Sequence, residues 1–135
     1  MLTADQLRGM TNEEIAAHNL RQIKELDEWK ARQRQGYVYF LRAGNTVKIG
    51  FSRTPKQRLE KLRIDNAFPV FICKLVKGSV ATERSFHRRF VEYRIRGEWF
   101  DLRGSLAKYL ERHIYPITDL PDPASDPKPE RDIIL

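Results

Sequence analysis

The sequence has a single cysteine and no long apolar run, and each absence excludes a class of protein. Cys73 stands alone among 135 residues, so no disulfide forms within the chain, as suits a reducing compartment. In the apolar segment PVFICKLV a free cysteine is expected to be a small buried residue rather than a reactive thiol. No stretch approaches the roughly 20 apolar residues of a transmembrane helix, and the N-terminus has no basic leader. We therefore expect a cytoplasmic protein without a membrane partner.

Residues that bind zinc are also sparse. His18, His87 and His113 are scattered and, together with Cys73, show none of the close spacing of a zinc site. No zinc finger or helix-turn-helix pattern is apparent. Any specificity for a nucleic acid would therefore have to come from a basic surface or from a partner.

Positive charge is concentrated in the middle of the chain. Residues 36–104 contain 15 basic and 6 acidic residues, a net charge of +9, whereas residues 1–35 are neutral and residues 105–135 carry −2. A basic excess within a folded segment attracts polyanions, of which nucleic acid is the commonest.

The two ends of the chain differ from the middle in composition. Thr11 followed by Glu14 forms a capping-box pattern, which predicts a helix over residues 12–34 within an N-terminal extension, 1–35. Its apolar stripe is too short for a coiled coil, which favours packing against the domain. Residues 116–135 contain five of the seven prolines and mostly acidic charge, so we expect an extended, flexible tail.

Residues 36–115 are expected to form one α+β domain. Two β-rich runs, YVYFLR and TVKIGFS, flank the turn-forming sequence Ala43–Asn45, which predicts a hairpin. The predicted fold is a small three-stranded antiparallel sheet flanked by helices. The remaining expected elements are a helix at 54–66, a strand at 69–76 and helices at 79–97 and 104–115.

One residue does not fit this pattern. Lys48 interrupts the second strand directly before Ile49 and Gly50. Its ordinary interpretation is a solvent-facing residue at a sheet edge.

Five short motifs occur in order between Gly36 and Leu110: VYFL, VKIG, QRLEKL, TERSFHRRF and GEWFDL. Together they resemble the GIY-YIG endonuclease superfamily, and most closely its branch named for a T5 phage open reading frame and a meiotically up-regulated gene. The resemblance implies a DNA endonuclease of phage or bacterial type with one Mg²⁺ or Mn²⁺ ion per site.

The resemblance also implies roles for individual residues. Tyr39, Lys48, Arg58 and His87 are the expected catalytic residues, and Glu83 is the expected metal ligand. This set suits phosphodiester hydrolysis, because a fixed cation and a metal offset the charge that builds on the attacked phosphate. Expected contacts to DNA, with RNA as an open alternative, are Arg53, Lys56, Arg63, Arg84 and Arg88. Gly50, Glu98 and Trp99 are expected to be structural, with Glu98 bracing a neighbouring cation.

Tyr39 and Lys48 form a specific hypothesis within this set. A tyrosine with an ordinary pKa of about 10 is a poor base, and neighbouring cations lower that pKa. If Lys48 faces Tyr39 across the hairpin, it supplies such a charge. If it points away, the ordinary interpretation holds.

The sequence departs from the superfamily pattern at several points. The first motif is YVY in place of Gly-Ile-Tyr, the second is KIG, and no asparagine follows Asn66. Three functions therefore remain open: a nuclease that nicks or cuts both strands, a nucleic-acid-binding module without significant cleavage, and a protein-interaction module that uses the N-terminal helix and acidic tail. A monomer and a homodimer also remain open.

Overall fold

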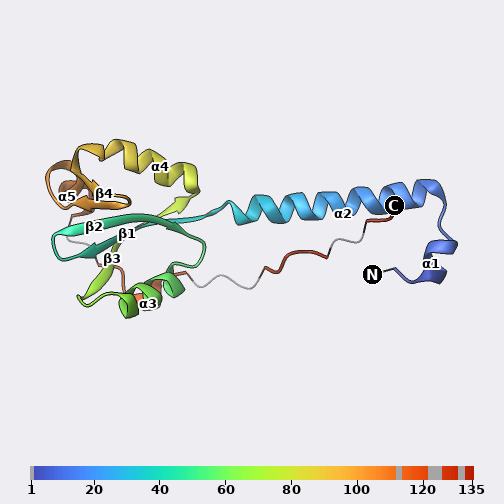
Figure 1. The fold of residues 1–135 in the computed structure, drawn as a ribbon, viewed down its shortest axis with the longest axis horizontal. Coiled ribbons are helices and arrows are strands. Elements are labelled where there is room, and N and C mark those ends of the chain that lie inside the picture. The colour runs from blue at the N-terminus through green and yellow to red at the C-terminus, as the bar shows by residue number, and fades with distance from the viewer. Residues whose placement is uncertain (1, 112–113, 122–125, 131–132) are drawn as a thin grey trace. The chain divides into compact units, whose positions relative to one another are not determined.

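The structure is a computed structural model that describes residues 2–111, 114–121, 126–130 and 133–135. Contacts divide the chain into two units, residues 1–33 with 125–135 and residues 34–124. The second unit contains the whole basic segment and the sheet (Figure 1). A site for a polyanionic partner is therefore expected in this unit.

Five antiparallel strands form the sheet, in the order β3-β1-β2-β5-β4. The predicted α+β class is confirmed, but the predicted count of three strands is wrong. The strands are β1 (Gly36–Ala43), β2 (Thr46–Ser52), β3 (Val70–Gly78), β4 (Arg94–Arg96) and β5 (Trp99–Asp101).

Of the two additional strands, β5 lies after the helix predicted over residues 79–97, and β4 lies within the end of that predicted helix. That helix, α4 (Val80–Arg89), stops before the buried Phe90 and is followed by a short 3-10 turn, η1 (Val91–Tyr93). Gly97 has a φ of 56°, and this left-handed conformation turns β4 back into β5 rather than capping a helix. A three-residue strand shows too little alternation to be recognised from sequence.

The sheet is covered on both faces (Figure 1), by α3 (Pro55–Asp65) on one and by α4 with α5 (Gly104–Leu110) on the other. Alternation along β1 produces this arrangement. Val38 and Phe40 pack in the core beneath α4 and α5, whereas Tyr39 and Leu41 pack in the core with Leu59 of α3. α5 is shorter than the helix predicted over 104–115, and part of that range, residues 112–113, lies outside the described residues.

The chain beyond α5 packs on the α3 face before the proline-rich end. The Tyr115 backbone N–H donates to the Ile72 carbonyl at 2.7 Å, next to the edge strand β3. A 3-10 turn, η2 (Ile117–Asp119), then brings Leu120 into the core. The segment predicted as a tail from residue 116 thus begins with packed residues, and its positions 122–125 and 131–132 lie outside the described residues.

The first unit consists of helices and the C-terminal segment. α2 (Asn12–Gln33) matches the predicted helix, with the Thr11 hydroxyl accepting from the Glu14 N–H at 3.2 Å, and is preceded by α1 (Ala4–Arg8), which was not predicted. The Asn19 side chain exchanges two hydrogen bonds of 2.7 Å with the Ile134 backbone. None of the helices in the described part of the chain has both the length and the apolar character needed to cross a membrane.

Cys73 is buried, and its thiol donates to the Phe40 carbonyl at 3.3 Å. Burial raises the pKa of this thiol to about 11, so at pH 8 about one molecule in a thousand carries a thiolate. We expect an aromatic disulfide reagent at pH 8 to label native protein at least about a hundredfold more slowly than protein in urea. Equal rates, followed by absorbance, would contradict a buried structural role.

Candidate active site

Three consecutive residues of β2, Lys48 to Gly50, lie at the centre of the candidate site. Antiparallel pairing places Lys48 opposite Leu41 and Gly50 opposite Tyr39 on β1. Directly opposed residues share a face of the sheet, so Lys48 lies on the face that carries Tyr39. The pairing thus agrees with the first part of the Tyr39–Lys48 hypothesis, that Lys48 lies on the same face of the hairpin as Tyr39.

Gly50 allows Tyr39 to cross the neighbouring strand. A Cβ built at position 50 would overlap the hydroxyl oxygen and the Cζ atom of Tyr39. The ring therefore occupies the space that any other side chain at position 50 would need. Tyr39 is only 1% exposed, so the ring is held by packing on all sides.

Arg58 of α3 reaches the hydroxyl of Tyr39. The Arg58 Nε donates to that oxygen at 3.5 Å, a long hydrogen bond. Burial raises the pKa of Tyr39 above its ordinary value, while the hydrogen bond and positive charge of Arg58 act in the opposite direction. The net direction is upward, so the side chain is a neutral phenol at pH 7. Arg58, rather than Lys48, provides the cationic influence predicted at this tyrosine.

Lys48 pairs with a carboxylate. Its Nζ lies 3.8 Å from Oε2 of Glu98, and the Lys48 side chain is largely buried. The Ile49 N–H also donates to the Glu98 carbonyl at 2.9 Å. The turn between β4 and β5 is thus bound to β2 by both its backbone and its side chain.

α4 contributes Glu83 and His87, which lie one turn apart. Oε1 of Glu83 lies 3.7 Å from Nε2 of His87, and both side chains are mostly buried. The same His87 nitrogen lies 2.8 Å from the Ile49 carbonyl oxygen. A carbonyl only accepts hydrogen bonds, so Nε2 carries the hydrogen and Nδ1 is the nitrogen left to accept a proton in the neutral ring.

Glu83 shares its electrostatic environment with the residues on the strands. Burial raises the pKa of its carboxyl, and the negative charge of Glu98 raises it further. His87, Arg84 and Lys48 lower that pKa, and the charges of both glutamates in turn raise the pKa of Tyr39. Two carboxylates and two fixed cations, Arg58 and Lys48, thus act on one small volume.

The donors fit a Mg²⁺ ion better than a zinc ion. Within the described ranges, no three or more histidine, cysteine or acidic side chains are arranged so that they alone could hold a metal ion, and His113 falls outside those ranges. Mg²⁺ is usually held by one or two carboxylates, with water and substrate phosphate as further ligands. Glu83, a mostly buried carboxylate whose ionised form is disfavoured by burial and by Glu98, suits such an ion.

A family model described as the T5orf172 domain matches residues 36–114, more than half of the chain. The chain belongs to this family. The match confirms the predicted T5 phage branch of the GIY-YIG-like superfamily and indicates a nuclease-like or DNA-binding module. No curated protein and no solved structure gives a significant match.

The T5orf172 domain does not gather the predicted DNA contacts on one helix. Lys56 and Arg63 lie on α3 and Arg84 and Arg88 on α4, on opposite faces of the sheet (Figure 1). The Arg53 Nε donates to the Gln35 carbonyl at 3.2 Å, near the start of β1. These basic residues therefore come from both faces of the sheet rather than from one helix, and the candidate site is the cluster of Tyr39, Lys48, Arg58, Glu83, His87 and Glu98.

Glu98 is the acidic member of the site whose electrostatic role was missed. It was expected to be structural and to brace a cation, and its pairing with Lys48 has that geometry. Its effect on the pKa of Glu83 and Tyr39 depends on the β4–β5 turn. The motif GEWF, which contains Glu98, was the available sequence signal for this residue, but the motif does not reveal where the β4–β5 turn lies.

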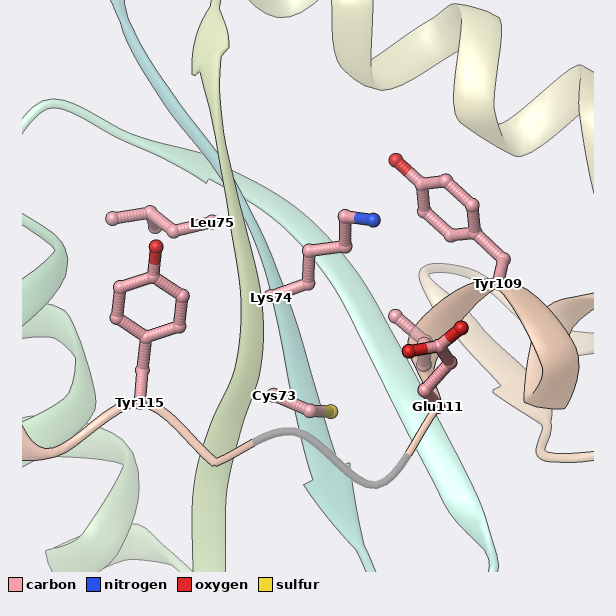
Figure 2. A pocket seen from close by; sticks show the side chains of 7 residues that line it. Cys73, Lys74, Leu75, Tyr109, Glu111 and Tyr115 are labelled. Atoms are coloured by element: carbon pink, nitrogen blue, oxygen red, sulfur yellow. The ribbon is translucent and has the colours of Figure 1, made fainter.

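A hollow of about 310 Å³ lies between β3 and α5 (Figure 2). It is lined by β3 residues, including Cys73 and Lys74, and by Tyr109 of α5. The Lys74 ammonium lies 3.8 Å from the centre of the Tyr109 ring, a cation–π contact. None of the six clustered residues lines this hollow, so it offers no entry to the site.

Replacing Gly50 by alanine tests whether the Tyr39–Gly50 contact organises the site. The new methyl group would overlap the Tyr39 ring, which is buried and cannot swing aside. We expect Gly50→Ala to lower the free energy of unfolding by about 1–3 kcal/mol, measured by urea denaturation. In a Tyr39→Ala background the same change is expected to cost less than about 0.5 kcal/mol. An equal cost in both backgrounds would place the strain elsewhere.

Proposed function

We propose that the chain is a DNA endonuclease that hydrolyses phosphodiester bonds and depends on a divalent metal. The observation that carries this proposal is the arrangement around Lys48–Gly50. A neutral tyrosine, two cations, a mostly buried carboxylate and a histidine meet there, on four different elements. A monomer has one such cluster, so nicking one strand is its simplest activity.

Arg58 and Lys48 are suited to the substrate phosphate. The Arg58 guanidinium donates to Tyr39 through Nε, which leaves its two terminal nitrogens as the donors proposed for phosphate oxygens. Lys48 is held by Glu98 at the same face of the sheet. Fixed cations of this kind stabilise the negative charge that develops on the equatorial oxygens.

Tyr39 is suited to positioning a water molecule through its hydroxyl group. Its raised pKa opposes formation of a phenolate, so the group accepts from Arg58 and remains a donor itself. The proton of the attacking water then needs another acceptor. Nδ1 of His87 is available, because Nε2 is bound to the Ile49 carbonyl.

Glu83 is the residue proposed to hold Mg²⁺ or Mn²⁺. Such an ion, when bound, lowers the pKa of water and offsets charge on the phosphate. Glu83 is fixed to α4, and α4 is held to β2 by His87. The carboxylate is therefore kept near Tyr39 and Lys48 by the fold itself.

A DNA-binding module with little or no cleavage is the second candidate. It is favoured by the burial of Tyr39, whose side chain is only 1% exposed and so has little contact with water. The basic excess of residues 36–104 serves binding under either proposal. The two candidates therefore differ in catalysis and agree on the polyanionic partner.

Nicking of supercoiled plasmid, followed by gel electrophoresis, separates the candidates. Wild-type protein is expected to nick with Mg²⁺ or Mn²⁺ and not with chelator. Glu83→Gln is expected to reduce the rate by at least about a hundredfold, because the amide is a poor substitute for a carboxylate ligand. Glu92→Gln, at an exposed position beyond α4, is the matched control and should nick at the wild-type rate.

Metal-dependent nicking that survives in Glu83→Gln would contradict the assigned site. Absence of nicking with every divalent ion, together with retained plasmid binding in a gel-shift assay, would favour the binding module.

The pH profile of nicking tests the interaction between the two glutamates. Burial and Glu98 raise the pKa of Glu83, so this carboxylate takes up a proton at a higher pH than an exposed glutamate does. Activity that needs the ionised form is therefore expected to fall on acidification, starting above the ordinary range of about 4.3. Glu98→Gln removes one cause of the raised pKa and should move this acid limb to lower pH. An unmoved limb would contradict the coupling.

A further inference from the structure

A second and larger hollow, of about 1080 Å³, opens at the end of the sheet that carries the β1–β2 turn. Its walls come from that turn, from the connection between α3 and β3, and from β4 and β5. Three aromatic side chains line it, Phe68, Phe71 and Trp99. This hollow is called the aromatic groove below.

The aromatic groove leaves apolar surface in contact with water. Phe68 is 76% exposed and Ile95 on β4 is 58% exposed. Contiguous apolar surface of this kind in a folded domain usually marks a binding site. The α3 face has its own core beneath, so these side chains are not needed to complete it.

Positive charge accompanies the aromatic residues. Arg42 and Arg96 line the groove, and none of the described residues that line it is acidic. The Arg42 guanidinium lies 5.9 Å from the centre of the Phe71 ring. Apolar ring faces with flanking arginines complement a ligand that is itself aromatic and anionic.

Strand register connects the groove to the catalytic cluster. Lys48 on β2 is opposite Trp99 on β5, and Trp99 is opposite Arg96 on β4. Lys48 and Trp99 are directly opposed and therefore share a face of the sheet, and Arg96, across the irregular β4–β5 pairing, lines the same groove as Trp99. These three residues form a row from the candidate active site to the groove.

We infer that the aromatic groove binds unpaired bases of a nucleic-acid strand whose backbone passes Lys48. This inference rests on the proposed function and deepens it, because it makes single-stranded or locally unpaired DNA the preferred substrate. Phe68 and Trp99 provide stacking faces for successive bases, and Arg96 contacts the intervening phosphate. An apolar peptide would use the ring faces, but it would gain nothing from the row of cations.

Trp99 offers a direct signal of occupancy. The chain has two tryptophans, so Trp29→Phe leaves Trp99 as the only one. Trp29 belongs to the other unit, outside the domain that contains the groove. We expect a 12-nucleotide oligothymidylate to quench the fluorescence of the full-length Trp29→Phe protein on titration, in the presence of chelator.

Substitutions on this background test the assignment. Phe68→Ala is expected to weaken oligothymidylate binding by about tenfold through lost stacking. Arg96→Gln is expected to weaken it and to lower the slope of log affinity against log salt by about 0.7. Val91→Ala, at a 61% exposed apolar position in η1, is the matched control and should bind as its parent does. Circular dichroism checks that each variant is folded.

The outcomes distinguish the groove from the proposed function. Quenching that is weakened by Phe68→Ala and Arg96→Gln, with a smaller effect on a duplex of the same length, supports the inference. Wild-type affinity in both variants overturns it, and plasmid nicking that persists in them leaves the nuclease proposal standing. Equal losses for single strand and duplex overturn the preference for unpaired bases. If wild-type protein does not nick plasmid but its oligothymidylate binding still depends on the groove, only the nuclease proposal is overturned.

Discussion

The contact between Gly50 and the ring of Tyr39 is the constraint on which the candidate site depends. It fixes where the phenol hydroxyl lies, because the ring crosses β2 at the one position that has no side chain. Arg58 then has a defined partner, and the guanidinium is oriented from α3 across the face of the sheet. A larger residue at position 50 would displace the Tyr39 ring and so move the hydroxyl group to which Arg58 donates.

The backbone of β2 connects the remaining groups to this contact. Ile49 donates to Glu98 and accepts from His87, so a single residue holds the β4–β5 turn on one side and α4 on the other. Its own side chain is buried in the core beneath α4. The candidate site residues on the other elements are thus placed relative to one strand, which provides the rigid support that a precise site requires.

The sequence correctly predicted those elements whose formation depends on residues close together along the chain. The β1–β2 hairpin and the start of α2 follow from the turn residues after Ala43 and from the Thr11 cap. The β4–β5 pair was missed because Gly97 serves equally well as a helix terminator and as a turn, and only pairing with β2 decides between them. The candidate site residues were predicted from the order of five short motifs. Their pKa shifts were not predictable from the sequence, because the largest cause of the raised pKa of Tyr39 is burial, which depends on tertiary packing.

The net positive charge of residues 36–104 lies outside the candidate site. Glu83 and Glu98 balance Arg58 and Lys48 within the cluster, so the whole +9 of residues 36–104 resides on other side chains. Those side chains, on α3, α4 and the aromatic groove, attract a polyanion over long range and lose that attraction as salt rises. The balanced cluster instead acts at contact distance, where burial strengthens each interaction. The long-range attraction of a polyanion therefore originates outside the candidate site, and a change at Glu83 leaves those basic side chains intact.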